Sequence, residues 1–157
     1  ATLASVIIDL CKSKGLTLSL AESCTGGAVS SALISVPGAS NVLDVNLVTY
    51  SNQAKTQWLD IPESLLEKHG AVSEETVRDM ATQLRQRTGT DIAASISGIA
   101  GPTGGTSEKP VGTVCFAVSS ASGTLTQTHY IQGNRSRIQY KATLIVLDMI
   151  FKRITSS

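Results

Sequence analysis

The sequence has little charge of either sign and few aromatic residues. Charged residues make up 16% of the chain and aromatic residues 4%, and the formal net charge is +1 without a basic or acidic run. Phosphate backbones are bound by clustered positive charge, so this composition argues against nucleic acid as the main partner. The hydrophobic fraction of 41% is ordinary for a globular protein. A length of 157 residues predicts one domain over 1–157.

Cysteine is also scarce. Cys11, Cys24 and Cys115 are far apart and odd in number, and no C-x-x-C pair occurs. This spacing argues against a disulfide framework and against a zinc site, so we expect neither a metal nor a cofactor. The sequence also lacks a signal peptide and a long apolar run. We therefore expect a cytoplasmic protein without a membrane partner.

Apolar periodicity and capping residues predict an alternation of helices and strands. We expect helices at 2–14, 25–36, 52–59, 62–68, 74–88 and about 135–154, and strands at 16–23, 45–51, 91–97, 111–118 and 124–131. The strand at 45–51 is rich in β-branched and apolar residues and is predicted to be buried. This order favours an α/β sandwich with a mainly parallel sheet. Because no helix separates the strands at 111–118 and 124–131, at least one strand of the sheet is expected to be antiparallel.

Polar residues gather after three of the predicted strands. The stretches are ESCTGG at 22–27, TYSNQAK at 49–55 and SGIAGPTGGTSEKP at 97–110. Ligands of open α/β sheets bind beyond the carboxyl ends of the strands, so these stretches are expected to form one site. The third is long for a loop without secondary structure, which is typical of functional or disordered segments.

Ser23, at the first strand-to-helix turn, is a candidate nucleophile. Two glycines follow it, and the N-terminus of the next helix would supply N–H groups for an oxyanion. The same position also suits a helix N-cap, formed by Ser23 or Thr25. Cys24 is the alternative nucleophile. Because side chains alternate along a strand, Ser23 and Cys24 are expected to face different ways, so that one of them packs.

A nucleophilic serine needs a base, and Lys55 is better placed for this role than either histidine. It follows the second strand closely, but burial or a nearby cation must lower its pKa from about 10.4 by roughly three. Without such a shift it is an exposed helix lysine. Tyr50 is either a proton relay or a tyrosine at the core edge. A Ser-His-Asp triad stays open, although His69 lies between two predicted helices and His129 inside a predicted strand.

The glycine-rich loop at 98–106 has the composition of a phosphate cradle. It contains neither a Walker loop nor a Rossmann fingerprint in the right context, so the signal is weak. Lys109, Arg135 and Arg137 are candidate phosphate ligands, although most such residues are only solvated.

A more specific signal comes from four stretches taken together. AESCTGG, VTYSNQAK, SGIAGPTGG and EKPVGTV occur in this order, with HGAVSEE between the second and the third. They resemble the CinA C-terminal domain family over nearly the whole chain. Stand-alone members of that family are nicotinamide-nucleotide amidohydrolases, and other members carry a molybdopterin-binding-like domain in front. The chain lacks that domain and so resembles a stand-alone member.

The resemblance implies a three-layer α/β/α sandwich on a mixed sheet. It also implies hydrolysis of the carboxamide of nicotinamide mononucleotide to nicotinate mononucleotide and ammonia, by a Ser/Lys mechanism without a metal. Ser23 would be the nucleophile and Lys55 the base, and Tyr50 would assist proton transfer to the leaving ammonia. N–H groups near the first turn would hold the oxyanion, and the glycine-rich loop with an arginine would hold the phosphate. The predicted substrate-binding residues are Thr25, Gly26, Gly27, Ser97, Gly98, Gly101, Gly104, Gly105, Arg135 and Arg137.

One position departs from the family pattern. The family usually has a second arginine four residues after the position of Arg135, and this chain has Gln139 there. The departure leaves two alternatives open, namely a non-catalytic nucleotide-binding paralogue and a serine amidase for another small amide. We expect a small-molecule nucleotide substrate, no nucleic-acid or membrane partner, and a homo-oligomer.

Overall fold

A computed structural model describes residues 1–156 of the chain. The elements follow one another as α1 (Leu3–Lys14), β1 (Leu18–Glu22), α2 (Ala28–Ile34), the short 3-10 helix η1 (Ala39–Asn41), β2 (Leu43–Val48), α3 (Asn52–Leu59), α4 (Glu63–His69), α5 (Glu74–Thr88), β3 (Ile92–Gly98), β4 (Thr113–Ser120), β5 (Gly123–Tyr130) and α6 (Arg135–Thr155). Each predicted helix and strand is present, with bounds that agree closely except at α2 and β2.

The five strands form one mixed sheet in the order β2-β1-β3-β4-β5. β1 pairs in parallel with β2 and β3, whereas β4 pairs antiparallel with β3 and β5. Four strands therefore run in one direction and β4 runs in the other. The predicted mixed, mainly parallel sheet is confirmed.

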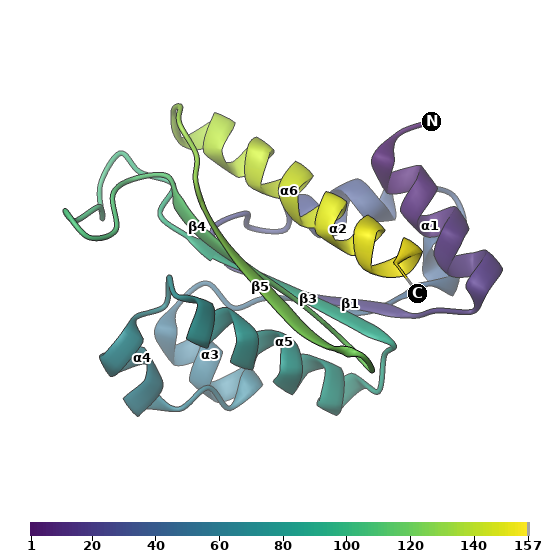
Figure 1. Cartoon of the computed structure of the whole chain (residues 1–157), viewed down its shortest axis with the longest axis horizontal. Helices are drawn as coiled ribbons and strands as arrows, with labels where there is room; N and C mark the ends of the chain where they lie inside the picture. The colour runs from purple at the N-terminus through teal and green to yellow at the C-terminus, as the bar shows by residue number, and fades with distance from the viewer. Residues whose placement is uncertain (157) are drawn as a thin grey trace.

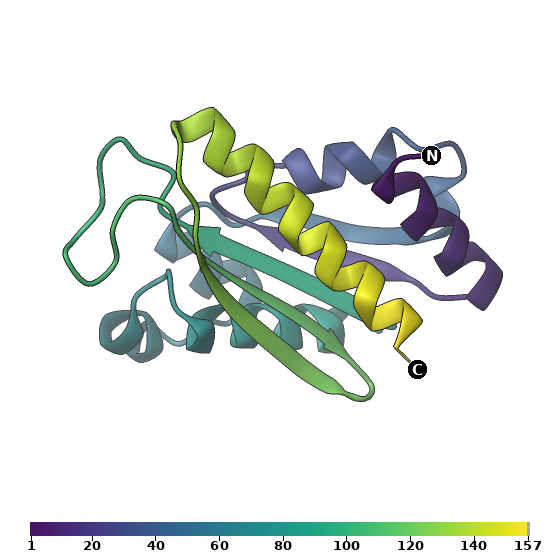
Figure 2. The same ribbon diagram turned by 45° about the horizontal axis from the view of Figure 1, so that its top comes forward.

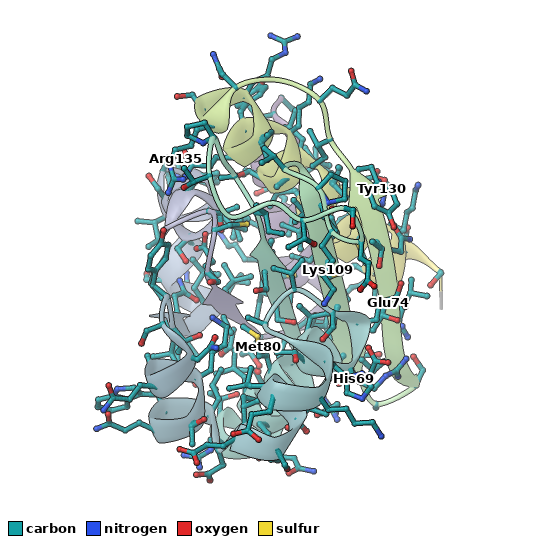
Figure 3. All side chains as sticks on the ribbon, turned by 90° about the vertical axis from the view of Figure 1, so that its left-hand side faces the viewer. His69, Glu74, Met80, Lys109, Tyr130 and Arg135 are labelled. Atoms are coloured by element: carbon teal, nitrogen blue, oxygen red, sulfur yellow. The ribbon has the colours of Figure 1, made fainter. Side chains whose placement is uncertain are left out.

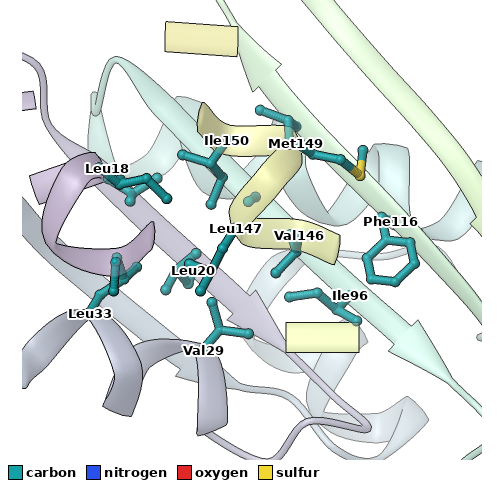
Figure 4. Close-up of a cluster of buried hydrophobic side chains, with 14 of the residues drawn as sticks. Leu18, Leu20, Val29, Leu33, Ile96, Phe116, Val146, Leu147, Met149 and Ile150 are labelled. Atoms are coloured by element: carbon teal, nitrogen blue, oxygen red, sulfur yellow. The ribbon is translucent and has the colours of Figure 1, made fainter. Parts of the chain in front are cut away.

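Helices cover both faces of the sheet. α1, α2 and α6 lie on one face, and α3, α4 and α5 lie on the other (Figure 1). The larger apolar core fills the space between the sheet and the first group of helices, where Leu20, Ile96, Phe116 and Val146 are fully buried (Figure 4). A smaller core around Met80 lies on the opposite face. This arrangement is the predicted three-layer α/β/α sandwich.

α2 and β2 differ from their predicted bounds. α2 begins at Ala28 and not at Thr25, because Gly26 and Gly27 adopt φ angles of 59° and 102° and form a turn that other residues disfavour. β2 is an edge strand whose Val48 is 48% exposed, so the prediction of a buried strand was wrong. A β-branched composition indicates a strand but does not distinguish an edge from a centre.

The carboxyl ends of β1, β2 and β3 lie at the same end of the sheet. The long loop between β3 and β4 extends from this end, at the left of Figures 1 and 2, and α6 begins beside it. The fold thus brings the three polar stretches of the sequence together. Among the described residues, no helix combines the length and the apolar character needed to cross a membrane.

Candidate active site

A cavity of about 240 Å³ opens where these strand ends meet. Six of the predicted site residues line it, namely Ser23, Tyr50, Lys55, Ser97, Gly98 and Arg135, together with Cys24, Ala71, Val72 and Ala100. In the described part of the chain, the lining contains two basic side chains, Lys55 and Arg135, and no carboxylate. The Arg135 guanidinium gives the cavity a positive charge that favours an anionic or electron-rich ligand.

Lys55 and Ser23 are in contact at the bottom of the cavity. Ser51 caps the N-terminus of α3, which places Lys55 in the first turn of this helix, facing the strand ends. Lys55 is 1% exposed, and its Nζ lies 3.1 Å from Ser23 Oγ. The Nζ also donates to the carbonyl oxygens of Thr49 at 2.8 Å and Tyr50 at 3.3 Å. Serine and lysine thus form a buried, hydrogen-bonded pair.

Burial changes the protonation of Lys55. Desolvation disfavours the ammonium form and lowers the pKa of Lys55 from 10.5 to about 8, and the one contribution that raises this pKa is a coulombic interaction with Cys24. No carboxylate bonds to the Nζ among the described residues. A neutral amine is therefore well populated just above neutral pH, as a general base requires.

Cys24 faces away from this pair. Its side chain belongs to the core formed with α1, α2 and α6, on the other face of the sheet from Lys55. Burial raises the pKa of the Cys24 thiol to about 12, and the Glu22 charge adds to the effect. The Sγ also packs so closely on Gly98 that a Cβ at that glycine would lie 3.0 Å from it. The prediction that one of the two neighbours packs is confirmed, and Cys24 is the one that packs.

Glu22 organises the turn that carries Ser23. Its carboxylate is fully buried and accepts five hydrogen bonds. Two come from the hydroxyls of Thr25 and Ser30, each at 2.6 Å, and three from the N–H groups of Gly27, Val29 and Ser30, at 2.9–3.1 Å. The first turn of α2 is thus capped by a side chain from the strand that precedes it.

These bonds correct the prediction for the first turn. The hydroxyl of Thr25 and the N–H of Gly27 donate to Glu22, and the N–H of Gly26 donates to the Ser23 carbonyl at 3.0 Å. None of the three residues lines the cavity, so the expectation that their N–H groups hold an oxyanion was wrong for Gly26 and Gly27. The alternative of a Ser23 or Thr25 cap is also excluded, because the N-cap position is Gly27.

Replacing Glu22 by glutamine is expected to destabilise the protein by about 2–4 kcal/mol. The amide would turn an N–H₂ toward donors and leave buried N–H groups without an acceptor. Urea denaturation at pH 7 measures the loss. Asp91→Asn is the matched control, because the exposed Asp91 also accepts from an N–H and a hydroxyl, both of Thr17, and should lose less than about 1 kcal/mol. Equal losses in the two variants would contradict the assigned role of Glu22.

Arg135 and Tyr50 form the mouth of the cavity. Arg135, which lies at the start of α6 (Figure 3), donates from Nη1 to the carbonyl of Gly101 at 2.7 Å and from Nη2 to the Tyr50 hydroxyl oxygen at 3.2 Å. Tyr50 is 61% exposed, so its ring is not part of the core. Gly101 contributes its carbonyl to this arrangement and does not itself line the cavity.

Several predicted phosphate ligands lie away from the cavity. Gly104 and Gly105 are exposed, and a Cβ at Gly105 would lie 2.7 Å from the backbone nitrogen of Val111. Neither glycine lines the cavity, and Arg137 does not line it either. Lys109 instead donates to the carbonyl of His69 at 2.6 Å and so ties the long loop to the end of α4 (Figure 3).

Gln139 has a structural contact in this chain. Its Nε2 donates to the carbonyl of Cys24 at 2.9 Å, which links α6 to the turn after β1. The residue that departs from the family pattern thus supports the backbone next to Ser23. The two histidines do not line the cavity, because His69 pairs with Glu75 and His129 bonds to Gln127. This placement argues against a histidine base.

Sequence reasoning missed three apolar residues of the lining. Ala71 and Val72 come from the connection between α4 and α5, and Ala100 comes from the long loop. No chemical signal marks such residues, although the stretch HGAVSEE that contains the first two contributed to the resemblance. They supply the apolar surroundings that desolvate Lys55.

Comparison with known proteins identifies the chain's relatives. The family model described as CinA C-terminal domain matches residues 1–154. A CinA-like protein of Geotalea uraniireducens is 44% identical over 155 residues, which are 99% of this chain and 37% of that protein. A CinA-like protein of Parasynechococcus marenigrum is 47% identical over 98% of this chain and 37% of that protein. The chain thus spans little more than a third of the length of these relatives.

Solved structures show the same fold at nearly full length. The competence/damage inducible protein CihA from Agrobacterium tumefaciens has a TM-score of 0.92 and 38% identity, and the match covers 95% of this chain and 92% of that one. A competence or damage-inducible protein from Enterobacter asburiae has a TM-score of 0.93 and 37% identity, and the match covers 98% of this chain and 96% of that one. The chain belongs to the CinA C-terminal domain family.

Proposed function

We propose that this domain is a Ser/Lys amidohydrolase that converts nicotinamide mononucleotide to nicotinate mononucleotide and ammonia. The contact that supports this activity most directly is the 3.1 Å approach of the buried Lys55 Nζ to Ser23 Oγ. The substrate identity rests on the family resemblance of the four sequence stretches, and the Arg135 guanidinium in the cavity lining suits the anionic part of a nucleotide.

The surroundings of Lys55 fix the direction of its lone pair. A neutral amine has two N–H donors and one lone pair. In the structure Nζ donates to Ser23 Oγ and to the carbonyls of Thr49 and Tyr50, and the Ser23 hydroxyl donates to the Tyr50 carbonyl at 3.4 Å. When the amine is neutral, the two carbonyls take its two N–H bonds and the lone pair is left for Ser23, whose hydroxyl then donates to Nζ in place of the Tyr50 carbonyl. Two backbone carbonyls therefore orient the base without adding a charge.

The reaction then follows in two stages. Ser23 Oγ loses its proton to Lys55 Nζ and attacks the carboxamide carbon, which gives a tetrahedral oxyanion. Collapse of this intermediate breaks the C–N bond, and the proton held by Lys55 passes to the leaving ammonia with the help of Tyr50. Water then attacks the ester, gives a proton to Lys55 and releases the carboxylate, and the proton returns to Ser23 Oγ. The net change is one amide and one water to one acid and one ammonia.

Arg135 is assigned to the anionic part of the substrate. A volume of about 240 Å³ is below the roughly 300–1,000 Å³ of pockets that enclose whole ligands, so the cavity suits the reacting ring while the ribose phosphate extends across the mouth. At the mouth, Arg135 donates to the Tyr50 hydroxyl oxygen, which leaves the phenol O–H available to donate toward the substrate.

The test is ammonia release from nicotinamide mononucleotide, with free nicotinamide as the comparison substrate. We expect turnover of the mononucleotide and at least tenfold lower kcat/KM for nicotinamide, which lacks the phosphate. Equal rates for the two compounds would instead indicate an amidase for small amides. A folded protein that binds the mononucleotide in calorimetry but releases no ammonia would be a binding module.

A further inference from the structure

Ser97 is the third hydroxyl of the cavity, and the proton transfers described above do not use it. It lies near the end of β3 and is 2% exposed, yet it is part of the cavity lining. The cavity therefore contains one more buried O–H donor than the Ser/Lys pair needs.

The strand register places Ser97 beside Ser23. β1 and β3 are parallel neighbours in which Ala21 lies opposite Ser95. Extending this register by two residues, one position past the end of β1 at Glu22, would place Ser23 opposite Ser97, and neighbouring strands are about 4.8 Å apart. Ser95 bonds to the Val77 carbonyl of α5, so the side chain of Ser97 two residues later points to the same face as Lys55.

The Ser97 hydroxyl has no hydrogen-bond partner within residues 1–156. Ser95 Oγ on the same strand donates to Val77 O at 2.6 Å, but no corresponding bond is made by Ser97. Of the fully enclosed side-chain oxygens and nitrogens in that range, only Asn46 Oδ1 and Thr49 Oγ1 are unpaired. Ser97 Oγ is therefore not fully enclosed, and the accessible space next to it is the cavity.

Three of the donors near Ser23 already have acceptors. The N–H groups of Gly26 and Gly27 bond to Ser23 O and Glu22. The two N–H bonds of neutral Lys55 go to the carbonyls of Thr49 and Tyr50. These three groups are therefore not free to donate to an oxyanion on a carbon attached to Ser23 Oγ, whereas the Ser97 hydroxyl in the same cavity lining is.

We propose that Ser97 is a catalytic residue whose hydroxyl donates a hydrogen bond to the oxyanion, an assignment that rests on the proposed amidohydrolase function. When Ser23 Oγ adds to the carboxamide carbon, the π electrons of the carbonyl move to its oxygen, and the Ser97 O–H donates to the resulting anion. No proton is transferred in this contact. The electrons return to form the ester carbonyl as the C–N bond breaks and ammonia leaves.

Steady-state kinetics on nicotinamide mononucleotide test this role in three variants. Ser97→Ala should lower kcat about 10²- to 10³-fold and change KM less than threefold, because the donor acts mainly in the transition state. Ser97→Thr keeps the hydroxyl and should recover most of that loss. Ser95→Ala is the matched control, since it removes a buried hydroxyl of the same strand and should lower the melting temperature while leaving kcat within threefold. A Ser97→Ala enzyme with unchanged kcat, or with a loss confined to KM, would overturn the assignment.

A fluorophosphonate probe gives a readout that does not depend on the natural substrate. Ser23 Oγ forms a bond to the phosphorus of the probe and displaces fluoride, while the Ser23 proton passes to Lys55, and the phosphoryl oxygen of the probe occupies the oxyanion position. Mass spectrometry should show labelling at Ser23 that is at least tenfold slower in Ser97→Ala than in the wild type and in Ser95→Ala. If the wild type is labelled but releases no ammonia from the mononucleotide, the proposed function fails while Ser97 is still tested. Equal labelling rates in all three, or no labelling of the wild type, would refute the role of Ser97.

Discussion

Replacing Ser23 by alanine is expected to abolish ammonia release from nicotinamide mononucleotide. Ser23 Oγ is the only serine oxygen in contact with the Lys55 Nζ in the part of the chain that the structure describes. Without it no covalent ester forms, and the loss in kcat should be at least 10³-fold and about 10⁶-fold if the pair acts as a unit. A coupled ammonia assay at enzyme concentrations high enough for single turnover measures the residual rate.

Cys24→Ala is the control for this result. The Cys24 thiol is packed in the core and has a pKa raised to about 12, so the thiolate is scarce at neutral pH. We expect kcat within tenfold of the wild type and a loss of stability of about 1–2 kcal/mol from the truncated packing. Binding of the mononucleotide by Ser23→Ala, measured by calorimetry, shows that the variant is folded. Activity that survives in Ser23→Ala and disappears in Cys24→Ala would reverse the assignment.

Much of the fold could be predicted because local signals decide it. Ser73 caps α5 with its side chain, and glycines end α1 and α5, as the sequence predicts. Asn134, one of two predicted caps for α6, is the observed one. The start of α2 could not be predicted in this way. Thr25 suits a cap by composition, but the carboxylate of Glu22 takes that function through bonds that depend on the folded turn.

The pairing of Ser23 with Lys55 could be predicted from the sequence, whereas most of the contacts around the pair could not. Ser23 and Lys55 follow the ends of adjacent parallel strands, so topology alone places them together. By contrast, the glycine-rich composition of the long loop suggested ligand contacts at Gly104 and Gly105, which in the structure are exposed and lie outside the cavity lining. The contact of Gln139 with Cys24 joins residues 115 positions apart, and no local pattern encodes it.

Substitution of Lys55 by methionine is expected to lower kcat/KM about 10²- to 10⁴-fold, which is the usual contribution of a general base. The wild type should show a kcat/KM that rises tenfold per pH unit below about pH 8 and is level above it, because burial lowers the Lys55 pKa to about 8 and only the neutral amine accepts the Ser23 proton. In Lys55→Met this limb should disappear. A limb near pH 8 that persists in the variant would assign the base to another group.

The same substitution also tests the lowered pKa of Lys55 by a stability measurement that does not depend on its role in catalysis. In the folded protein Lys55 releases its proton near pH 8, whereas in the unfolded chain it keeps the proton to about 10.5. Between these values the unfolded chain binds more protons, so the wild type gains stability relative to Lys55→Met as the pH rises. The lowering corresponds to a gain of about 3 kcal/mol between pH 7 and pH 11. Urea denaturation of both proteins over this range measures the gain. Parallel stability curves would show that burial does not shift Lys55, and a neutral amine could then not be the base near neutral pH.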